Sequence, residues 1–107
     1  MGYWSEVAVH MDTLAYYALE RFDLGIMDEC EIHFLDNDEV ILYWDYIKWY
    51  DSFDEVKAFE DALDFLNRNG YDWYFMRIGE DIEDIETAKS DSYGYIYNHT
   101  PHRGIAW

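Results

Sequence analysis

Residues 39–70, EVILYWDYIKWYDSFDEVKAFEDALDFLNRNG, join an aromatic strand to an amphipathic helix, and this junction decides the fold. Ser52 and Glu55 have the S-x-x-E spacing of a capping box, in which each side chain accepts a hydrogen bond from the other residue's backbone N–H at the start of a helix. Asn69 and Gly70 supply the left-handed conformation that ends one. The apolar positions between these signals recur every three or four residues, at Val56, Phe59, Leu63 and Leu66. The stretch therefore predicts a strand over residues 39–49 and a helix that ends at Gly70.

The composition predicts one folded domain over residues 1–107, with residues 99–107 as an irregular tail. A chain of 107 residues can bury a single core between two layers of secondary structure. Half of its residues are hydrophobic and 21% are aromatic, which excludes a disordered acidic chain. No linker, repeat or low-complexity segment indicates a second domain.

The charge balance is strongly acidic. The chain has 24 Asp and Glu residues against 7 Lys and Arg, a formal net charge of −17. Such a surface repels phosphate backbones and anionic lipids, so we expect no direct binding to nucleic acid or membrane. A protein partner with a basic surface is favoured instead.

Cysteine usage and the absence of targeting signals favour the cytoplasm. Cys30 is the single cysteine and cannot form an internal disulfide, which fits a reducing compartment, and we expect it to be a small buried hydrophobe. No basic segment followed by an apolar run opens the sequence, and no apolar stretch approaches about 18 residues, the length that spans a bilayer.

The first third of the chain predicts a strand, a helix and a second strand. Alternation over residues 2–11 predicts a strand with Val7 and Val9 in the core. Asp12 is the expected N-cap of a helix that runs to about residue 24 and is stopped by Gly25. The side chains expected to share the face of that helix are Leu14, Tyr17, Ala18 and Phe22. Residues 29–35 predict the next strand, with Ile32 and Phe34 pointing inward.

The rest of the chain predicts three more strands around the capped helix. Asp36-Asn37-Asp38 is typical of a tight hairpin leading into strand 39–49, which is long enough that we expect a bulge near Tyr46. Residues 71–78 predict a strand after the helix. Residues 79–91 predict an acidic loop, and residues 92–98 a final alternating strand.

This order predicts an α+β fold, the ferredoxin-like βαββαβ arrangement with one added C-terminal strand. We expect an antiparallel sheet of core order 4-1-3-2, with the last strand beside the fourth and both helices on one face. The opposite face should carry Trp4, Glu6, His33, Tyr43 and the series Tyr93, Tyr95, Tyr97. A homodimer, a protein partner or the C-terminal tail would cover it, since large apolar faces are seldom bare.

No motif predicts an enzyme, a cofactor or a metal. The sequence contains no nucleophile elbow, Gly-rich phosphate loop or H-E-x-x-H segment. His99 and His102 are spaced for chelation in a turn, but two ligands do not make a zinc site. The Asp36–Glu39 run lacks the twelve-residue ligand series of a calcium loop. We therefore expect no catalytic residue and no resident cofactor or metal.

The acidic residues are grouped in two segments, and these are the predicted partner-binding sites. The predicted binding residues of the loop are Glu80, Asp81, Glu83, Asp84 and Glu86, and those around the second strand are Asp36, Asp38 and Glu39. Tyr95 and Tyr97 would add aromatic anchors. Acids gathered on one side would let the domain occupy a basic groove made for nucleic acid; acids spread evenly would mainly keep it in solution.

Three blocks of sequence resemble a set of small phage-encoded proteins that open with a G-Y-x-S-E-V-A segment. The first is MGYWSEVAV at residues 1–9, the second KWYDSFDEV at 48–56 with Phe59-Glu60, and the third RIGED at 77–81 followed by Asp84-Ile85-Glu86. The resemblance carries over no catalytic residue. It implies a viral accessory protein that acts in the bacterial cytoplasm, and small acidic proteins of that kind often inhibit host defence.

The leading hypothesis is a non-enzymatic phage protein that inhibits a host antiviral defence component by stoichiometric binding through its acidic surface, in the manner of a nucleic-acid mimic. It predicts that changing Asp81, Glu83, Asp84 and Glu86 to Lys abolishes inhibition and leaves the fold intact. One alternative is a homo-oligomeric sponge that sequesters a signalling nucleotide, which would need arginines around a pocket. Others are an interaction domain with a different target and an enzyme without a recognised motif.

Overall fold

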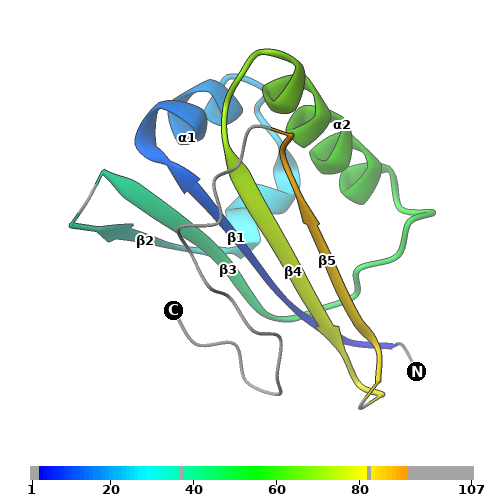
Figure 1. The fold of residues 1–107 in the computed structure, drawn as a ribbon. Helices are drawn as coiled ribbons and strands as arrows, with labels where there is room; N and C mark the ends of the chain where they lie inside the picture. The colour runs from blue at the N-terminus through cyan, green and yellow to red at the C-terminus, as the bar shows by residue number, and fades with distance from the viewer. Residues whose placement is uncertain (1–2, 37, 82, 92–107) are drawn as a thin grey trace.

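The sheet is built around β1 (Ser5–Asp12), whose neighbours on both sides are antiparallel. The computed structural model describes residues 3–36, 38–81 and 83–91. The other elements are α1 (Thr13–Glu20), the 3₁₀ helix η1 (Gly25–Glu29), β2 (Glu31–Leu35), β3 (Glu39–Ile47), α2 (Asp54–Arg68), β4 (Trp73–Gly79) and β5 (Ile85–Lys89). Both α-helices pack against the same face of the sheet (Figure 1). The fold is therefore α+β, as expected.

The five strands have the order β2-β3-β1-β4-β5, and every adjacent pair is antiparallel. The first four strands follow the expected order, and a fifth strand extends the β4 edge. That fifth strand is Ile85–Lys89, inside the segment expected to be a loop, so the loop prediction for residues 79–91 is wrong. Ile85 and Thr87 favour extended backbone, and pairing with β4 outweighs the acidic composition. The expected strand 92–98, with Tyr93, Tyr95 and Tyr97, and the tail 99–107 lie outside the described residues.

The core lies between the helices and the sheet. Val7 and Val9 are fully buried on its sheet side, which confirms the predicted core pair. The predicted stripe of α2 is confirmed as well, because Val56, Phe59, Leu63 and Leu66 are all buried. Two buried indoles tie the layers together, because Trp44 Nε1 donates to the Ile26 carbonyl and Trp73 Nε1 to the Leu63 carbonyl, each at 2.9 Å.

Helix α1 begins where expected but presents a different face. Asp12 caps it by accepting a hydrogen bond from Ala15 N at 2.8 Å, which confirms the predicted cap. The expected inward face is wrong: the buried residues are Ala15, Tyr16 and Leu19, whereas Leu14 is 69% exposed. The direction in which the chain leaves β1 sets the rotation of so short a helix, and one residue of offset turns a helical face by about 100°. The helix also ends at Glu20, four residues before the expected end.

For the edge strand β2, the predicted orientation of the side chains is confirmed, but their predicted burial is wrong. Ile32 pairs with Leu42 and Phe34 with Val40, so both point to the helix side. Phe34 nevertheless remains 60% exposed, although its ring meets the Tyr16 ring in a T-shaped contact at 5.6 Å between centroids. A strand with one neighbour lacks the cover that a central strand receives.

The bulge expected near Tyr46 is present. Val7 pairs with Trp44 and Ser5 with Ile47. Between these two pairs β3 therefore contains one residue more than β1. The extra residue brings Trp44 and Ile47 into the same core and leaves Tyr46 67% exposed. The bulge thus turns one tyrosine outward beside the start of β1.

The start of α2 differs from the prediction, and its end does not. Phe53 occupies the N-cap position without a side-chain hydrogen bond, so the predicted capping box of Ser52 and Glu55 is not formed. At the other end Gly70 has φ 81°; its N–H donates to the Asn67 carbonyl, and Tyr71 N–H donates to the Leu66 carbonyl. This pair of bonds is a Schellman motif and confirms the predicted stop.

The face of the sheet opposite the helices carries Glu6, His33 and Tyr43, as the strand register requires. Trp4 precedes β1 and stacks on Tyr46. Apolar residues on this face are buried as well: Ala8, Ile41, Met76 and Ile78 are each at most 8% exposed. No helix in the described part of the chain is long and apolar enough to cross a membrane.

Candidate functional site

The predicted partner-binding acids lie at two opposite ends of the sheet. Asp36 and Asp38 belong to the β2–β3 connection, and Glu39 pairs with Asp12 at the end of β1. The residues from Glu80 to Glu86 follow Gly79, which pairs with Ser5 at the start of β1. Seven residues of extended strand separate these ends by about 23 Å. The two groups therefore lie apart, one at the β2–β3 connection and the other at the β4–β5 connection (Figure 1).

At the β4–β5 end, two of the predicted acids hold the guanidinium of Arg77. Arg77 Nη2 and Nη1 donate to the two oxygens of Asp84 at 2.8 and 3.2 Å, and Arg77 Nε donates to Glu86 at 2.9 Å. Arg77 Nη1 also donates to Ser5 Oγ at 3.0 Å. The Arg77 side chain is only 13% exposed, so this arrangement is part of the fold. The carboxylates of Asp84 and Glu86 are consequently engaged in holding the fold together, in contrast to their predicted role in binding a partner.

The N-terminal segment is fixed across the same hairpin. Tyr3 donates from its hydroxyl to Asp84 at 2.6 Å and accepts from Asp81 N–H at 2.9 Å. The backbone N–H of Trp4 donates to the Glu80 carboxylate. Arg77 and then the Tyr3 hydroxyl hold the pKa of Asp84 below its usual value, which keeps this carboxylate charged.

A glycine is required where this segment crosses the hairpin. A Cβ placed on Gly79 would collide with the Asp84 carboxylate and the Tyr3 hydroxyl. Tyr3 N–H in turn donates to the Tyr50 hydroxyl. Residues 3, 50, 79 and 84 thus bring into contact the three sequence blocks quoted above, which are far apart along the chain.

A groove of about 360 Å³ opens beside this junction, and we call it the acidic groove. Its lining residues are Trp4, Ser5, Glu6, Asp45, Tyr46, Ile78, Gly79 and Glu80. Three of them are carboxylates. The rings of Trp4 and Tyr46 stack at 4.4 Å between centroids with 10° between their planes. The groove therefore combines negative charge with an exposed aromatic surface.

The electrostatics of the acidic groove favour a cation. Tyr43 donates from its hydroxyl to Glu6 and lies 3.2 Å from Asp45 Oδ1, which draws the two carboxylates together at one rim. Burial, and next the hydrogen bond to Glu6, raise the pKa of Tyr43, so its phenol stays protonated. Lys48 places its ammonium 5.0 Å from the Trp4 ring centroid, a cation–π contact within the chain itself.

Of the predicted binding residues in the described part of the chain, Glu80 alone lines the acidic groove. Asp81 and Glu83 are exposed on the adjoining hairpin, while Tyr95 and Tyr97 lie outside the described residues. The sequence did not single out Asp45 or Tyr46 as binding residues. The signal that could have found them was the expected bulge, because it turns these residues of β3 outward.

Among the residues that the structure describes, the single cysteine and the potential metal ligands do not form a second site. Cys30 donates from Sγ to the Met27 carbonyl at 3.2 Å, and burial raises its pKa to about 11, so the thiol stays protonated at neutral pH. Cys30 packs against the core but is only half-buried, less than the buried position expected. Over residues 3–36, 38–81 and 83–91, no three His, Cys, Asp or Glu side chains converge as metal ligands would.

Comparisons of the chain with protein-family models, with curated proteins and with solved structures return no match.

Proposed function

We propose that this protein is a non-enzymatic binding module that docks on a basic surface of a partner protein through the acidic groove. The observation that carries the proposal is the convergence of Glu6, Asp45 and Glu80 on one hollow beside the exposed ring of Tyr46. A partner arginine fits this chemistry because its planar guanidinium stacks on an aromatic face and donates paired hydrogen bonds to a carboxylate.

The wider charge of the molecule assists the same interaction. The net charge of −17 attracts a basic partner over a distance set by the ionic strength, and such a field raises the association rate more than the affinity. Exposed Asp81 and Glu83 extend the negative surface along the hairpin next to the acidic groove. Tyr46 and Trp4 would supply the well-packed anchors that dominate binding energy at protein interfaces.

The biological setting we propose is inhibition of a host antiviral defence component by a phage protein. The support is the resemblance in three sequence blocks together with an acidic surface suited to a site that normally holds nucleic acid. The inhibitor would act stoichiometrically in the bacterial cytoplasm. Because the acids occupy both ends of the sheet, mimicry of a nucleic acid would involve more than one contact along the molecule.

We also propose that the part from β1 to β4 is a ferredoxin-like split βαβ fold. The strand order β2-β3-β1-β4, the antiparallel pairing and the two helices on one face support it. In this arrangement the acidic groove lies at the end of the sheet where β1 and the bulged end of β3 meet the turn after β4.

The proposal is tested with an arginine-rich peptide as a defined basic partner. We expect Asp45→Lys to weaken binding of the labelled peptide about tenfold, because it places a positive charge in the acidic groove. Asp61→Lys is the matched control: it changes the net charge equally, on the exposed side of α2. It should weaken binding about twofold or less, through the general field alone.

The aromatic part of the site is tested in the same assay. Tyr46→Ala should weaken peptide binding, whereas Tyr17→Ala removes a similarly exposed ring from α1 and should not. Equal effects of the two lysine variants would mean that the charge acts diffusely, and the proposed site would be wrong. Changing Asp81, Glu83, Asp84 and Glu86 together to Lys is not a clean test of binding. Lysines at positions 84 and 86 would place cations against Arg77 and disturb the fold.

A further inference from the structure

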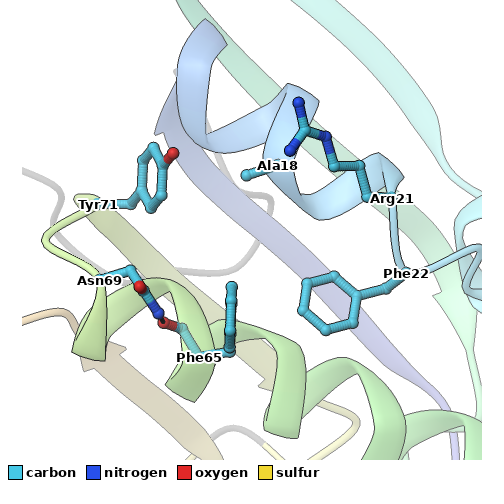
Figure 2. A pocket seen from close by; sticks show the side chains of 6 residues that line it. All are labelled: Ala18, Arg21, Phe22, Phe65, Asn69 and Tyr71. Carbon is cyan, nitrogen blue, oxygen red and sulfur yellow. Dashed lines mark hydrogen bonds between the residues drawn. The ribbon is translucent and has the colours of Figure 1, made fainter.

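A second hollow lies on the helix layer, between the end of α1 and the end of α2. It measures about 400 Å³ and we call it the α1–α2 pocket; its lining residues are Ala18, Arg21, Phe22, Phe65, Asn69 and Tyr71. Figure 2 shows the rings of Phe22 and Phe65 on one side of the pocket, and on the other side Ala18 between Tyr71 and Arg21. The two phenylalanine rings meet edge to face at 5.2 Å. The pocket thus has an apolar wall and a polar rim.

Arg21 is unusual because its guanidinium has no carboxylate partner in the described part of the chain. Arg77 pairs with Asp84 and Glu86, and Arg68 pairs with Asp64. Arg21 makes no such pair, although acids outnumber basic residues by 24 to 7 and Glu20 and Asp23 are its near neighbours in sequence. Its charge is therefore available to an external anion.

The other polar groups of the rim are arranged differently. The Tyr71 side chain is half-buried, and its hydroxyl has no hydrogen-bond partner among residues 3–36, 38–81 and 83–91. Asn69 donates from Nδ2 to the Phe65 carbonyl at 2.8 Å, which fixes the end of α2 at the pocket. One cationic donor and one hydroxyl donor thus border the aromatic wall.

We propose that the α1–α2 pocket binds a small organic acid that carries a single negative charge and a planar aromatic body. The carboxylate would pair with Arg21 and accept from the Tyr71 hydroxyl, and the ring would lie against Phe22 and Phe65. A volume of about 400 Å³ is within the usual range for small-molecule sites. This site is separate from the acidic groove.

The charge of the molecule limits the ligand to a monoanion. A nucleotide with two or more phosphate charges would find one guanidinium and would be repelled by the net charge of −17. An aryl carboxylate needs only one cationic partner, and contact with the rings offsets part of the long-range repulsion. The same reasoning disfavours the pocket as a trap for signalling nucleotides.

The test is a calorimetric titration with naphthalene-2-carboxylate, its neutral amide, and adenosine monophosphate. We expect the carboxylate to bind with a Kd below about 1 mM, and the amide and the nucleotide to bind at least about tenfold more weakly. Arg21→Gln should reduce carboxylate binding about tenfold, through loss of the charge-assisted contact. Arg68→Gln is the matched control, because Arg68 is also exposed and near the end of α2 but does not line the pocket.

The outcomes distinguish this proposal from the one for the acidic groove. Asp45→Lys should leave carboxylate binding unchanged, and Arg21→Gln should not weaken binding of the arginine-rich peptide. Circular dichroism of Arg21→Gln serves as the folding check. Equal affinity for carboxylate and amide, tighter binding of the nucleotide, the same loss in Arg21→Gln and Arg68→Gln, or no saturation by the carboxylate would each overturn the assignment.

Discussion

Arg77 joins several segments at the end of the sheet where the β4–β5 hairpin meets the start of β1. Its guanidinium contacts Asp84, Glu86 and Ser5, and through Asp84 it is linked to Tyr3. Burial disfavours the charged guanidinium, but the hydrogen bonds that Arg77 donates to Asp84 and Glu86 outweigh this effect and raise the pKa of Arg77. The residue therefore positions the N-terminal segment that forms one wall of the acidic groove.

We expect Arg77→Met to lower the free energy of unfolding by about 2 kcal/mol, because it removes several charge-assisted hydrogen bonds at a largely buried site. Arg68→Met is the control: both members of its pair with Asp64 are more than half exposed, and the loss should be about 0.5 kcal/mol or less. Urea unfolding at pH 7 measures both. Equal losses would mean that the Arg77 cluster is no more than a surface ion pair.

The stability difference between the wild type and Arg77→Met should depend on pH, because it involves the carboxylate of Asp84. The pKa of Asp84 is lowered in the folded protein, so its contribution is complete above its unfolded value of about 4 and is lost as the pH falls through the folded value. The stability gap between the wild type and Arg77→Met should therefore narrow below about pH 4. A gap that stays constant down to pH 2 would contradict the assigned role of Asp84.

At the scale of elements, the two helices start by different means. In α1 the strand runs directly into the helix, and the carboxylate of Asp12 caps it. In α2 the N-cap position is Phe53, and the acids of the first turn, Asp54 and Glu55, face the positive end of the helix. An S-x-x-E match in sequence is therefore insufficient when the tertiary path moves the helix start along by a residue.

We expect Asp12→Ala to destabilise the fold by about 1 kcal/mol, the usual value of an N-cap hydrogen bond. Ser52→Ala should change stability by no more than about 0.5 kcal/mol, because the Ser52 side chain does not cap α2. Urea midpoints of the two variants measure the difference. A loss of stability for Ser52→Ala as large as that for Asp12→Ala would show that the Ser52 side chain does cap α2.

At the scale of the whole molecule, the excess of carboxylates opposes folding. Three of the 24 acids, Asp64, Asp84 and Glu86, form ion pairs with Arg within the described part of the chain. The pKa of Glu60 reflects the crowding: burial raises it first, and Asp51, Glu86 and Asp61 add to the effect. Self-repulsion of this kind destabilises the compact state and weakens with ionic strength.

We therefore expect thermal stability to rise when NaCl increases from about 0.1 M to about 1 M, as the Debye length falls from about 10 Å to about 3 Å. A gain of about 1 kcal/mol would raise Tm by roughly 5 °C for a domain of this size. KCl should act equally, since screening does not depend on the cation. A fall in Tm would show that attractive ion pairs outweigh the repulsion.

Features of the fold that depend on residues close together in sequence could be predicted, whereas features that depend on contacts between distant segments could not. The core stripe of α2, the Gly70 stop, the Val7 and Val9 pair and the bulge beside Tyr46 all depend on spacing or turn chemistry within a few residues. The buried face of α1 was not predictable, because the exit from β1 rotates the helix. The loop prediction for residues 79–91 is wrong because the acids that precede β5 favour a loop, and only pairing with β4 makes this segment a strand.

Spacing and composition were enough to predict an α+β fold with an antiparallel sheet, a helix layer and a large negative charge. Which acids are bound internally and which border the acidic groove depends on the three-dimensional arrangement of the strands. Tyr3 and Asp84 form a hydrogen bond although they are 81 residues apart in the sequence. Asp45, Glu6 and Glu80 line the same groove although they come from β3, from β1 and from the turn after β4. Local patterns report backbone conformation, whereas the partner of a carboxylate depends on which distant segments the sheet places side by side.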